Sequence, residues 1–401
     1  MKPVKNQRTP FLLQLAMASL LLTGMANAQS IWSGGGSPDG NFSNSANWNT
    51  APATTGGNTM NFDGSANLNA TNDMSLSLAA DQSINFNSGA SAFTIWGNLI
   101  RSGGIANNSS YLQTVNMQLR LNGTRTFNTG TAGLQLGQPV GSTSSTSGRT
   151  VTKTGSGDLI IGSGTASGGG ASYNVSAGAL VFSGSSATSL GTAATGVSLT
   201  ASGTALRLNN SGTLSMVGTI STVSGSSLTL NNSAAVTVTG GTTIAAGASL
   251  TGIGNLGGGL ISILGNIAPG VSAIGTMSVS SLTLGAGSII TMEIDRSASQ
   301  NADLLSSSGT LTYGGTLTVD NIGASLAAGD SFNLFDGTIA GTFDATNLPS
   351  LGSGLEWDMS QLNSSGIISV TMAPVPEPTS IALLGIGLGM GLWQIRRRKV
   401  A

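Results

Sequence analysis

The sequence predicts an all-β protein whose chain coils as a solenoid of many short strands. Apolar-x-apolar triplets recur through residues 197–294, for example LRL at 206–208, LTL at 228–230 and VTV at 236–238. Alternation with a period of two places both apolar side chains of a triplet on one face of a sheet. The segments between the triplets are rich in Gly, Asn and Ser, which suit tight turns. No part of this interval shows a convincing helical period.

A solenoid is favoured over a two-layer sandwich by the kind of residue available for the core. A sandwich usually has strands about every 8–12 residues and larger aromatic core side chains. Here only 4% of the residues are aromatic, and the core candidates are Leu, Val, Ile and Ala. Aliphatic side chains that stack on their equivalents suit the narrow interior of a parallel β-helix.

The composition excludes several kinds of chemistry. The chain has no histidine and no cysteine, which removes Cys/His nucleophiles, zinc sites and disulfides. The whole chain has a formal charge of −1, but the stretch 29–370 is acidic because carboxylates outnumber its seven basic residues. Nucleic-acid binding is disfavoured, since it requires a clustered basic surface. We therefore expect no cofactor and no nucleic-acid partner.

Residues 1–28 have the form of a signal peptide. A basic start is followed by the apolar run FLLQLAMASLLL at 11–22. Ala26 and Ala28 then supply the small-x-small pattern that signal peptidase recognises. We expect cleavage after Ala28 and export of the body that follows.

The region 29–150 is expected to hold an N-terminal cap and the first part of the solenoid. Trp32, Phe42, Trp48 and Phe62 are the candidate anchors of the cap, because an open solenoid end must be covered. The alternative is that the tryptophan pair stacks on sugar rings. Capping is the favoured interpretation.

The region 151–304 is expected to form β-helix repeats. Its first segment, 151–186, contains a Lys-Thr-Gly-x-Gly sequence, a strand, a glycine-rich turn and a second strand. This segment resembles an autotransporter-associated β-strand repeat, and 247–284 resembles the part that often follows one. The resemblance implies a right-handed parallel β-helix. The matching positions are Lys153, Thr154, Gly155, Gly157, Leu159, Gly178 and Leu180.

Carboxylates are the only candidate catalytic groups that remain. Glu293 and Asp295 flank Ile294, so on a strand both side chains would point outward, roughly 7 Å apart. Glycoside hydrolysis uses two carboxylates about 5–9.5 Å apart, which makes a glycan-cleaving enzyme the alternative function. A single pair on a solvated strand is more often a plain polar exterior, and we expect no enzyme. The aspartates of later turns could bind calcium, which needs only oxygen ligands.

The region 305–373 is expected to be a C-terminal β cap. It keeps the strand pattern but gains larger side chains at Phe332, Phe335, Phe343 and Trp357. Aromatic side chains of this size suit the covered end of a solenoid better than its narrow interior.

The segment 374–401 joins three unlike features in a fixed order. Pro376, Glu377 and Pro378 come first, and the uncharged apolar run 379–395 follows. As a helix this run is nearly long enough to cross a bilayer, and positive charge after it should stay on the cytoplasmic side. The chain ends in a basic cluster formed by Arg396, Arg397, Arg398 and Lys399.

This segment resembles a PEP-CTERM sorting signal. The resemblance implies a Gram-negative bacterium, an exosortase that cleaves near the Pro-Glu-Pro triplet, and association with exopolysaccharide. A permanent membrane anchor is the alternative interpretation of the tail. We therefore expect a non-enzymatic β-solenoid that crosses the inner membrane transiently through 379–395 and reaches the cell surface or extracellular matrix. The alternative function is a carbohydrate-active β-helix enzyme.

Overall fold

A computed structural model describes residues 29–76, 78–144, 149–270, 272–374, 388–390 and 392–394. The expected signal peptide, with Ala26 and Ala28, lies outside the described residues, as do the Pro-Glu-Pro triplet and the terminal basic cluster. The chain forms two compact units. The first unit extends to Val181 and includes Ser189–Thr195, and the second comprises Phe182–Thr188 and the residues from Gly196 onward.

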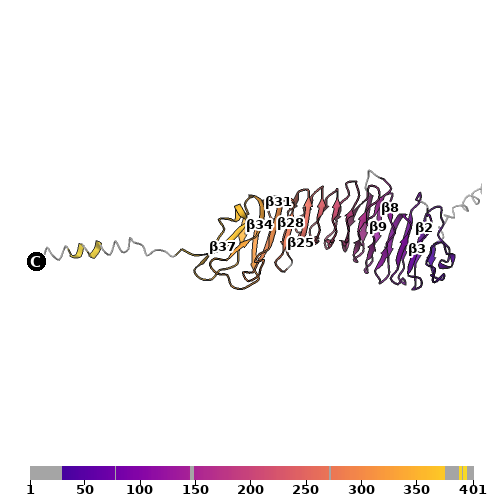
Figure 1. Cartoon of the computed structure of the whole chain (residues 1–401), viewed down its shortest axis with the longest axis horizontal. Helices are drawn as coiled ribbons and strands as arrows, with labels where there is room; N and C mark the ends of the chain where they lie inside the picture. Colours follow the sequence, from indigo (N-terminus) through magenta and orange to yellow (C-terminus); the bar gives the residue numbers. More distant parts are fainter. Residues whose placement is uncertain are drawn as a thin grey trace, which may run out of the picture. The chain divides into compact units, whose positions relative to one another are not determined.

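The first unit is a parallel β-solenoid, whose successive rungs can be followed in Figure 1. Strand pairing divides it into three faces, which we call the A-face, the B-face and the C-face. The A-face consists of β1 (Ser30–Trp32), β2 (Asn58–Phe62), β4 (Gln82–Phe86), β6 (Ile100–Asn107), β9 (Arg125–Asn128), β12 (Arg149–Thr154) and β15 (Ala171–Val175). The B-face consists of β3 (Asn69–Asn72), β5 (Thr94–Gly97), β7 (Gln113–Val115), β10 (Leu134–Leu136) and β13 (Leu159–Ile161).

The C-face is narrower than the other two faces. It is made by the beginning of β6, β8 (Leu119–Leu121) and β11 (Gly141–Ser142). The remaining short elements are a 3-10 turn at Ser45–Asn47, β14 (Gly164–Thr165), β16 (Ala179–Phe182) and β17 (Thr188–Ser189). From β4 to β12, the chain therefore passes from A-face to B-face to C-face before the next rung begins.

The second unit contains parallel ladders of the same kind. One ladder contains β18 (Val197–Leu199), β21 (Ile220–Ser221), β24 (Thr242–Ile244), β26 (Ile261–Ile263) and β29 (Leu282–Leu284). A second contains β19 (Ala205–Leu208), β22 (Ser227–Asn231), β25 (Ser249–Gly258), β27 (Asn266–Pro269), β30 (Ile289–Ile294), β32 (Thr316–Asn321) and β35 (Ala345–Asn347). A third joins parts of β25 to β20 (Leu214–Met216), β23 (Val236–Val238), β28 (Thr276–Val279), β31 (Leu304–Tyr313) and β34 (Phe335–Gly341).

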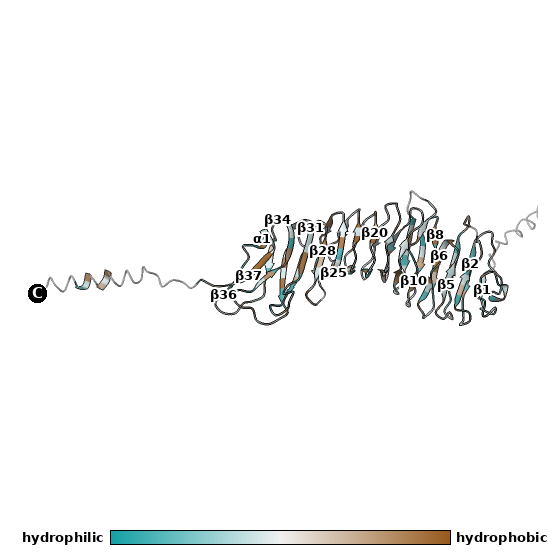
Figure 2. Ribbon diagram, in the orientation of Figure 1, coloured by the Kyte–Doolittle hydropathy of each residue, from teal (hydrophilic) through white to brown (hydrophobic). Residues whose placement is uncertain are grey.

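Like residues stack on like residues along the interior of the second unit. In the second of these ladders, five aliphatic side chains lie in register and none is more than 1% exposed. They are Leu228, Leu250, Ile267, Ile290 and Leu317. The residues beside them point outward and are mostly Ser and Thr. Figure 2 shows the resulting mixture of hydrophobic and hydrophilic positions along the strands. The apolar-x-apolar triplets are thus the strands of a parallel solenoid, as the sequence predicted.

An antiparallel sheet lies at the C-terminal end of the second unit. Its strands are β33 (Ser331–Asn333), β37 (Ile367–Met372) and β36 (Leu355–Asp358), and the short helix α1 (Leu362–Ser365) precedes β37. The parallel rungs of β31, β32, β34 and β35 also fall within the region 305–373, so this region combines both kinds of sheet. The right-handed coil stays a prediction.

The apolar run 379–395 is described only at 388–390 and 392–394, where the chain is helical. Within the described ranges, no helix has the length and apolar character needed to cross a bilayer.

Candidate functional site

The predicted N-terminal anchors form one packed aromatic cluster. Trp32, Phe42 and Phe62 are at most 1% exposed, and Trp48 is 5% exposed. The ring centroids of Trp32 and Trp48 lie 4.9 Å apart in an edge-to-face arrangement, which is a favoured geometry for aromatic pairs. The indole N–H of Trp48 donates to the carbonyl oxygen of Phe42 at 3.0 Å. This burial is incompatible with sugar stacking by Trp32 and Trp48, and capping of the solenoid end stays the predicted role of the cluster.

A different tryptophan is exposed on the first unit. Trp96 lies on β5, and 49% of its surface is accessible. Its neighbour Ile95 points into the core, so alternation along the strand turns the indole outward. Thr71 is the register partner of Trp96 on β3, and Asn116 follows β7 on the next rung. No local pattern in the sequence indicates this site, because only the register of the rungs reveals which aromatic side chain faces solvent.

The residues in register with Trp96 and Thr94 on the neighbouring rungs are uncharged and polar. The outward column two residues before it contains Thr94, Thr114 and Gln135 on successive rungs. A Cβ at Gly137 would lie 2.6 Å from the Oδ1 atom of Asn116, so the absence of a side chain at Gly137 makes room for this amide. The B-face therefore combines an exposed indole with hydroxyl and amide groups that can donate and accept hydrogen bonds.

The predicted carboxylate pair does not form an isolated outward pair. Glu293 lies on β30 in register with Asp320 on β32. Partial burial and the charge of Asp320 both raise the pKa of Glu293. Asp295 follows the strand and accepts hydrogen bonds from the backbone N and the Oγ of Ser297 at 2.9 and 2.6 Å. These bonds lower the pKa of Asp295 and give this residue a clear role in the turn.

Asp303 is a third carboxylate near Glu293, and it is fully buried. Its sequence context is typical of a turn, and in the structure it lies just before β31. Its carboxylate accepts hydrogen bonds from the backbone N–H groups of Gly275 and Glu293, both at 2.7 Å. Burial raises the pKa of Asp303 to about 6, although the two backbone donors oppose this shift. Asp303 thus joins neighbouring rungs, which accounts for its burial.

A shallow groove on the second unit lies apart from these carboxylates. Its volume is about 450 Å³, and it crosses β23, β25, β28 and β31. The described residues that line it are all uncharged: Ala235, Val236, Thr237, Asn255, Leu256, Gly257, Gly258, Ser278, Val279, Ser280, Ser306, Ser307 and Ser308. Glu293 and Asp295 are therefore not placed in this groove. Among the described residues, no group of three or more Asp or Glu side chains is arranged to hold a metal ion.

Lys153 is buried inside the first unit. Its Nζ donates to the carbonyl oxygens of Gly155, Gly157 and Ala177, each at 2.6 Å, and to the Oγ1 of Thr129 at 3.0 Å. Burial lowers the pKa of Lys153 to about 8, and the charge of Asp158 opposes this shift. The Lys-Thr-Gly-x-Gly sequence thus places an ammonium group where it binds several turn carbonyls at once.

The fold and these sites define a β-solenoid protein with an exposed aromatic platform and a tightly bonded interior. Its C-terminal residues 374–399 match the PEP-CTERM protein-sorting motif. This motif implies an exported and sorted protein that is processed by an exosortase. No curated protein matches the chain significantly.

Proposed function

We propose that this protein is a non-enzymatic component of the cell surface or extracellular matrix that associates with exopolysaccharide. The observation that carries the proposal is the half-exposed indole of Trp96 on the B-face. An aromatic ring offers a flat apolar surface on which the C–H face of a sugar ring can pack. Thr71 and Asn116 lie beside it and can bond to sugar hydroxyls.

The C-terminal motif supports the location that this function requires. After export through the signal peptide, the run 379–395 would hold the protein transiently in the inner membrane of a Gram-negative cell. Exosortase would then cleave near Pro376, Glu377 and Pro378 and release the body to the surface. The basic residues Arg396, Arg397 and Arg398 would remain on the cytoplasmic side until cleavage.

Co-sedimentation of the full chain with the host's exopolysaccharide tests this function. We expect Trp96→Ala to weaken binding about tenfold, which corresponds to roughly 1.4 kcal/mol. Tyr111→Ala is a matched control, because Tyr111 is 51% exposed and lies in the same unit. Equal binding by wild type and Trp96→Ala would contradict the assignment of the B-face.

Glycan cleavage is a second candidate function. It is favoured by the opposite pKa shifts of Glu293 and Asp295, since one carboxyl is then easier to protonate than the other. The same incubation distinguishes the candidates: binding without new reducing ends supports the structural role, and new reducing ends support an enzyme.

A further inference from the structure

Two arginines occupy matching positions on neighbouring rungs of the C-face. Arg101 on β6 and Arg120 on β8 are register partners, and rungs of a parallel sheet lie about 4.8 Å apart. Both side chains are partly exposed. Two like charges at this separation repel each other unless anionic groups lie nearby. The net repulsion therefore depends on the anionic groups that lie close enough to offset the positive charges of these arginines.

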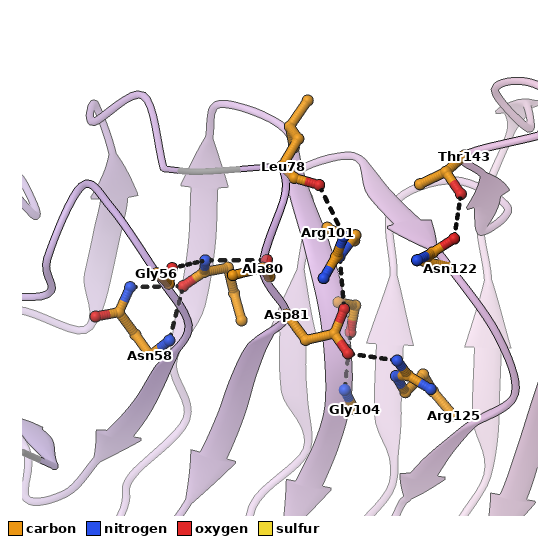
Figure 3. Close-up of polar contacts among 12 residues, drawn as sticks. Gly56, Asn58, Leu78, Ala80, Asp81, Arg101, Gly104, Asn122, Arg125 and Thr143 are labelled. Carbon is orange, nitrogen blue, oxygen red and sulfur yellow. Dashed lines mark hydrogen bonds and ion pairs between the residues drawn. The ribbon is translucent and has the colours of Figure 1, made fainter. Parts of the chain in front are cut away.

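One carboxylate serves two of the arginines in this region. Asp81 Oδ1 lies 2.6 Å from Nε of Arg101, and Asp81 Oδ2 contacts Nη2 of Arg125 (Figure 3). Arg101 also donates to the carbonyl oxygen of Leu78 at 3.1 Å. The side chains of Arg101 and Arg125 keep 15% and 26% of their surface exposed. Asp81 neutralises only one of these two positive charges.

Arg120 has a neutral partner instead. Its Nε donates to the Oγ of Ser167 at 2.8 Å. A Cβ at Gly141 would lie 2.1 Å from that same Oγ, so glycine at 141 leaves the space in which Ser167 meets the arginine. Within the part of the chain that the structure describes, Arg120 forms no ion pair. We call Arg101, Arg120 and Arg125 the arginine strip: Asp81 pairs with Arg101 and Arg125, and Arg120 bonds to Ser167.

The sequence around the arginine strip offers no other compensation. No Asp or Glu occurs between Asp81 and Asp158, whereas five Arg and Lys residues do. The stretch 293–358 has the opposite balance, with nine carboxylates and one arginine. An anionic partner is therefore attracted to the first unit at the arginine strip and is repelled by the acidic stretch.

We propose that the arginine strip binds the carboxylate groups of an acidic polysaccharide. This inference rests on the proposed association with exopolysaccharide and specifies its chemical class. The planar guanidinium group matches a carboxylate through paired hydrogen bonds, and the Nη groups of Arg120 can take this role while Nε holds Ser167. Arg101 follows Trp96 by five residues, so one glycan can contact the indole of Trp96 on the B-face and the C-face arginines Arg101 and Arg120 together.

Binding of the full chain to alginate, a polymer of uronic acids, tests the proposal. We expect Arg120→Gln to weaken alginate binding about tenfold, because glutamine can still donate to Ser167 but carries no charge. Arg120→Lys keeps the charge without the paired geometry and should lie between wild type and Arg120→Gln. The matched control is Arg207→Gln, which removes the same charge from an exposed position on β19 of the second unit. Unchanged melting temperatures establish that each variant is folded.

Several outcomes would overturn the assignment. They are unchanged alginate binding by Arg120→Gln, an equal loss caused by Arg207→Gln, or binding of single-stranded DNA as tight as that of alginate. Dextran sulfate separates carboxylate recognition from a general preference for sulfated glycans, and tighter binding to it would contradict the carboxylate assignment. Neutral dextran separates this inference from the proposed function. If Trp96→Ala loses dextran binding while Arg120→Gln binds alginate as wild type does, the role of Trp96 is supported and the arginine-strip proposal is rejected.

Discussion

The Nζ of Lys153 donates a 2.6 Å hydrogen bond to the carbonyl oxygen of Ala177 on the following rung. The same ammonium group reaches back to the Oγ1 of Thr129 on the preceding rung. Phe127 and Val175 are the register partners of Lys153 on those rungs. One side chain therefore forms hydrogen bonds to three successive turns. All of the oxygen atoms that accept from this buried ammonium group are uncharged.

The first prediction concerns the loss of this ammonium group. Lys153→Met keeps the aliphatic stem but leaves the carbonyl oxygens of Gly155, Gly157 and Ala177 without this donor. Each unsatisfied buried polar group costs about 1–3 kcal/mol, so the free energy of unfolding should fall by about 3 kcal/mol or more. Urea unfolding measures this change, with Arg207→Met as an exposed control. A loss below about 1 kcal/mol would show that the bonds matter little.

The second prediction concerns the pH dependence of stability. The pKa of Lys153 is lowered to about 8 in the folded protein, whereas an unfolded lysine has a pKa of about 10.4. Between these values the unfolded state binds more protons, so this residue makes stability rise with pH from about 8 to 10.4. Thermal melts of wild type minus those of Lys153→Met should show the rise. A flat difference over that window would contradict the lowered pKa.

The third prediction concerns the carboxylate pair. Glu293→Gln removes the repulsion from Asp320, and Asp295→Asn keeps an oxygen that can accept from Ser297. We expect the double variant to bind exopolysaccharide as wild type does and to change the free energy of unfolding by under about 0.5 kcal/mol. Titration with exopolysaccharide measures the binding, and urea unfolding measures the free energy of unfolding. A glycan-cleaving activity present in wild type and absent from the variant would favour the enzyme.

The fourth prediction concerns the sorting triplet. Replacement of Pro376, Glu377 and Pro378 by alanine leaves the run 379–395 and the terminal basic cluster intact, so membrane insertion should proceed. The alanines would permit a helix where the prolines forbid one. We expect the variant to accumulate uncleaved in the inner membrane, while wild type appears about 2–3 kDa shorter at the surface. Fractionation and immunoblotting check both forms, and identical behaviour would identify the tail as a plain anchor.

Much of the architecture was predictable because a strand repeats its pattern every two residues. The triplets at 206–208, 228–230 and 236–238 fall on β19, β22 and β23, and their small aliphatic cores correctly favoured a solenoid. The C-terminal sorting motif was equally predictable, because it is defined by the order of the Pro-Glu-Pro triplet, the apolar run and the basic cluster along the chain. Local spacing also placed Glu293 and Asp295 side by side, but it could not show that Asp320 faces Glu293 from the next rung.

The amino-acid sequence by itself determined the strand rhythm, the narrow aliphatic core and the sorting tail, because these depend on residues close together in the chain. Only the tertiary structure decided that Trp32 is buried and Trp96 exposed, and that Asp81 serves both Arg101 and Arg125. Residues on neighbouring rungs are about 20 or more positions apart in sequence, and the length of each intervening turn sets their register. Contacts between rungs therefore depend on how the whole chain coils and cannot be deduced from neighbouring residues in the sequence.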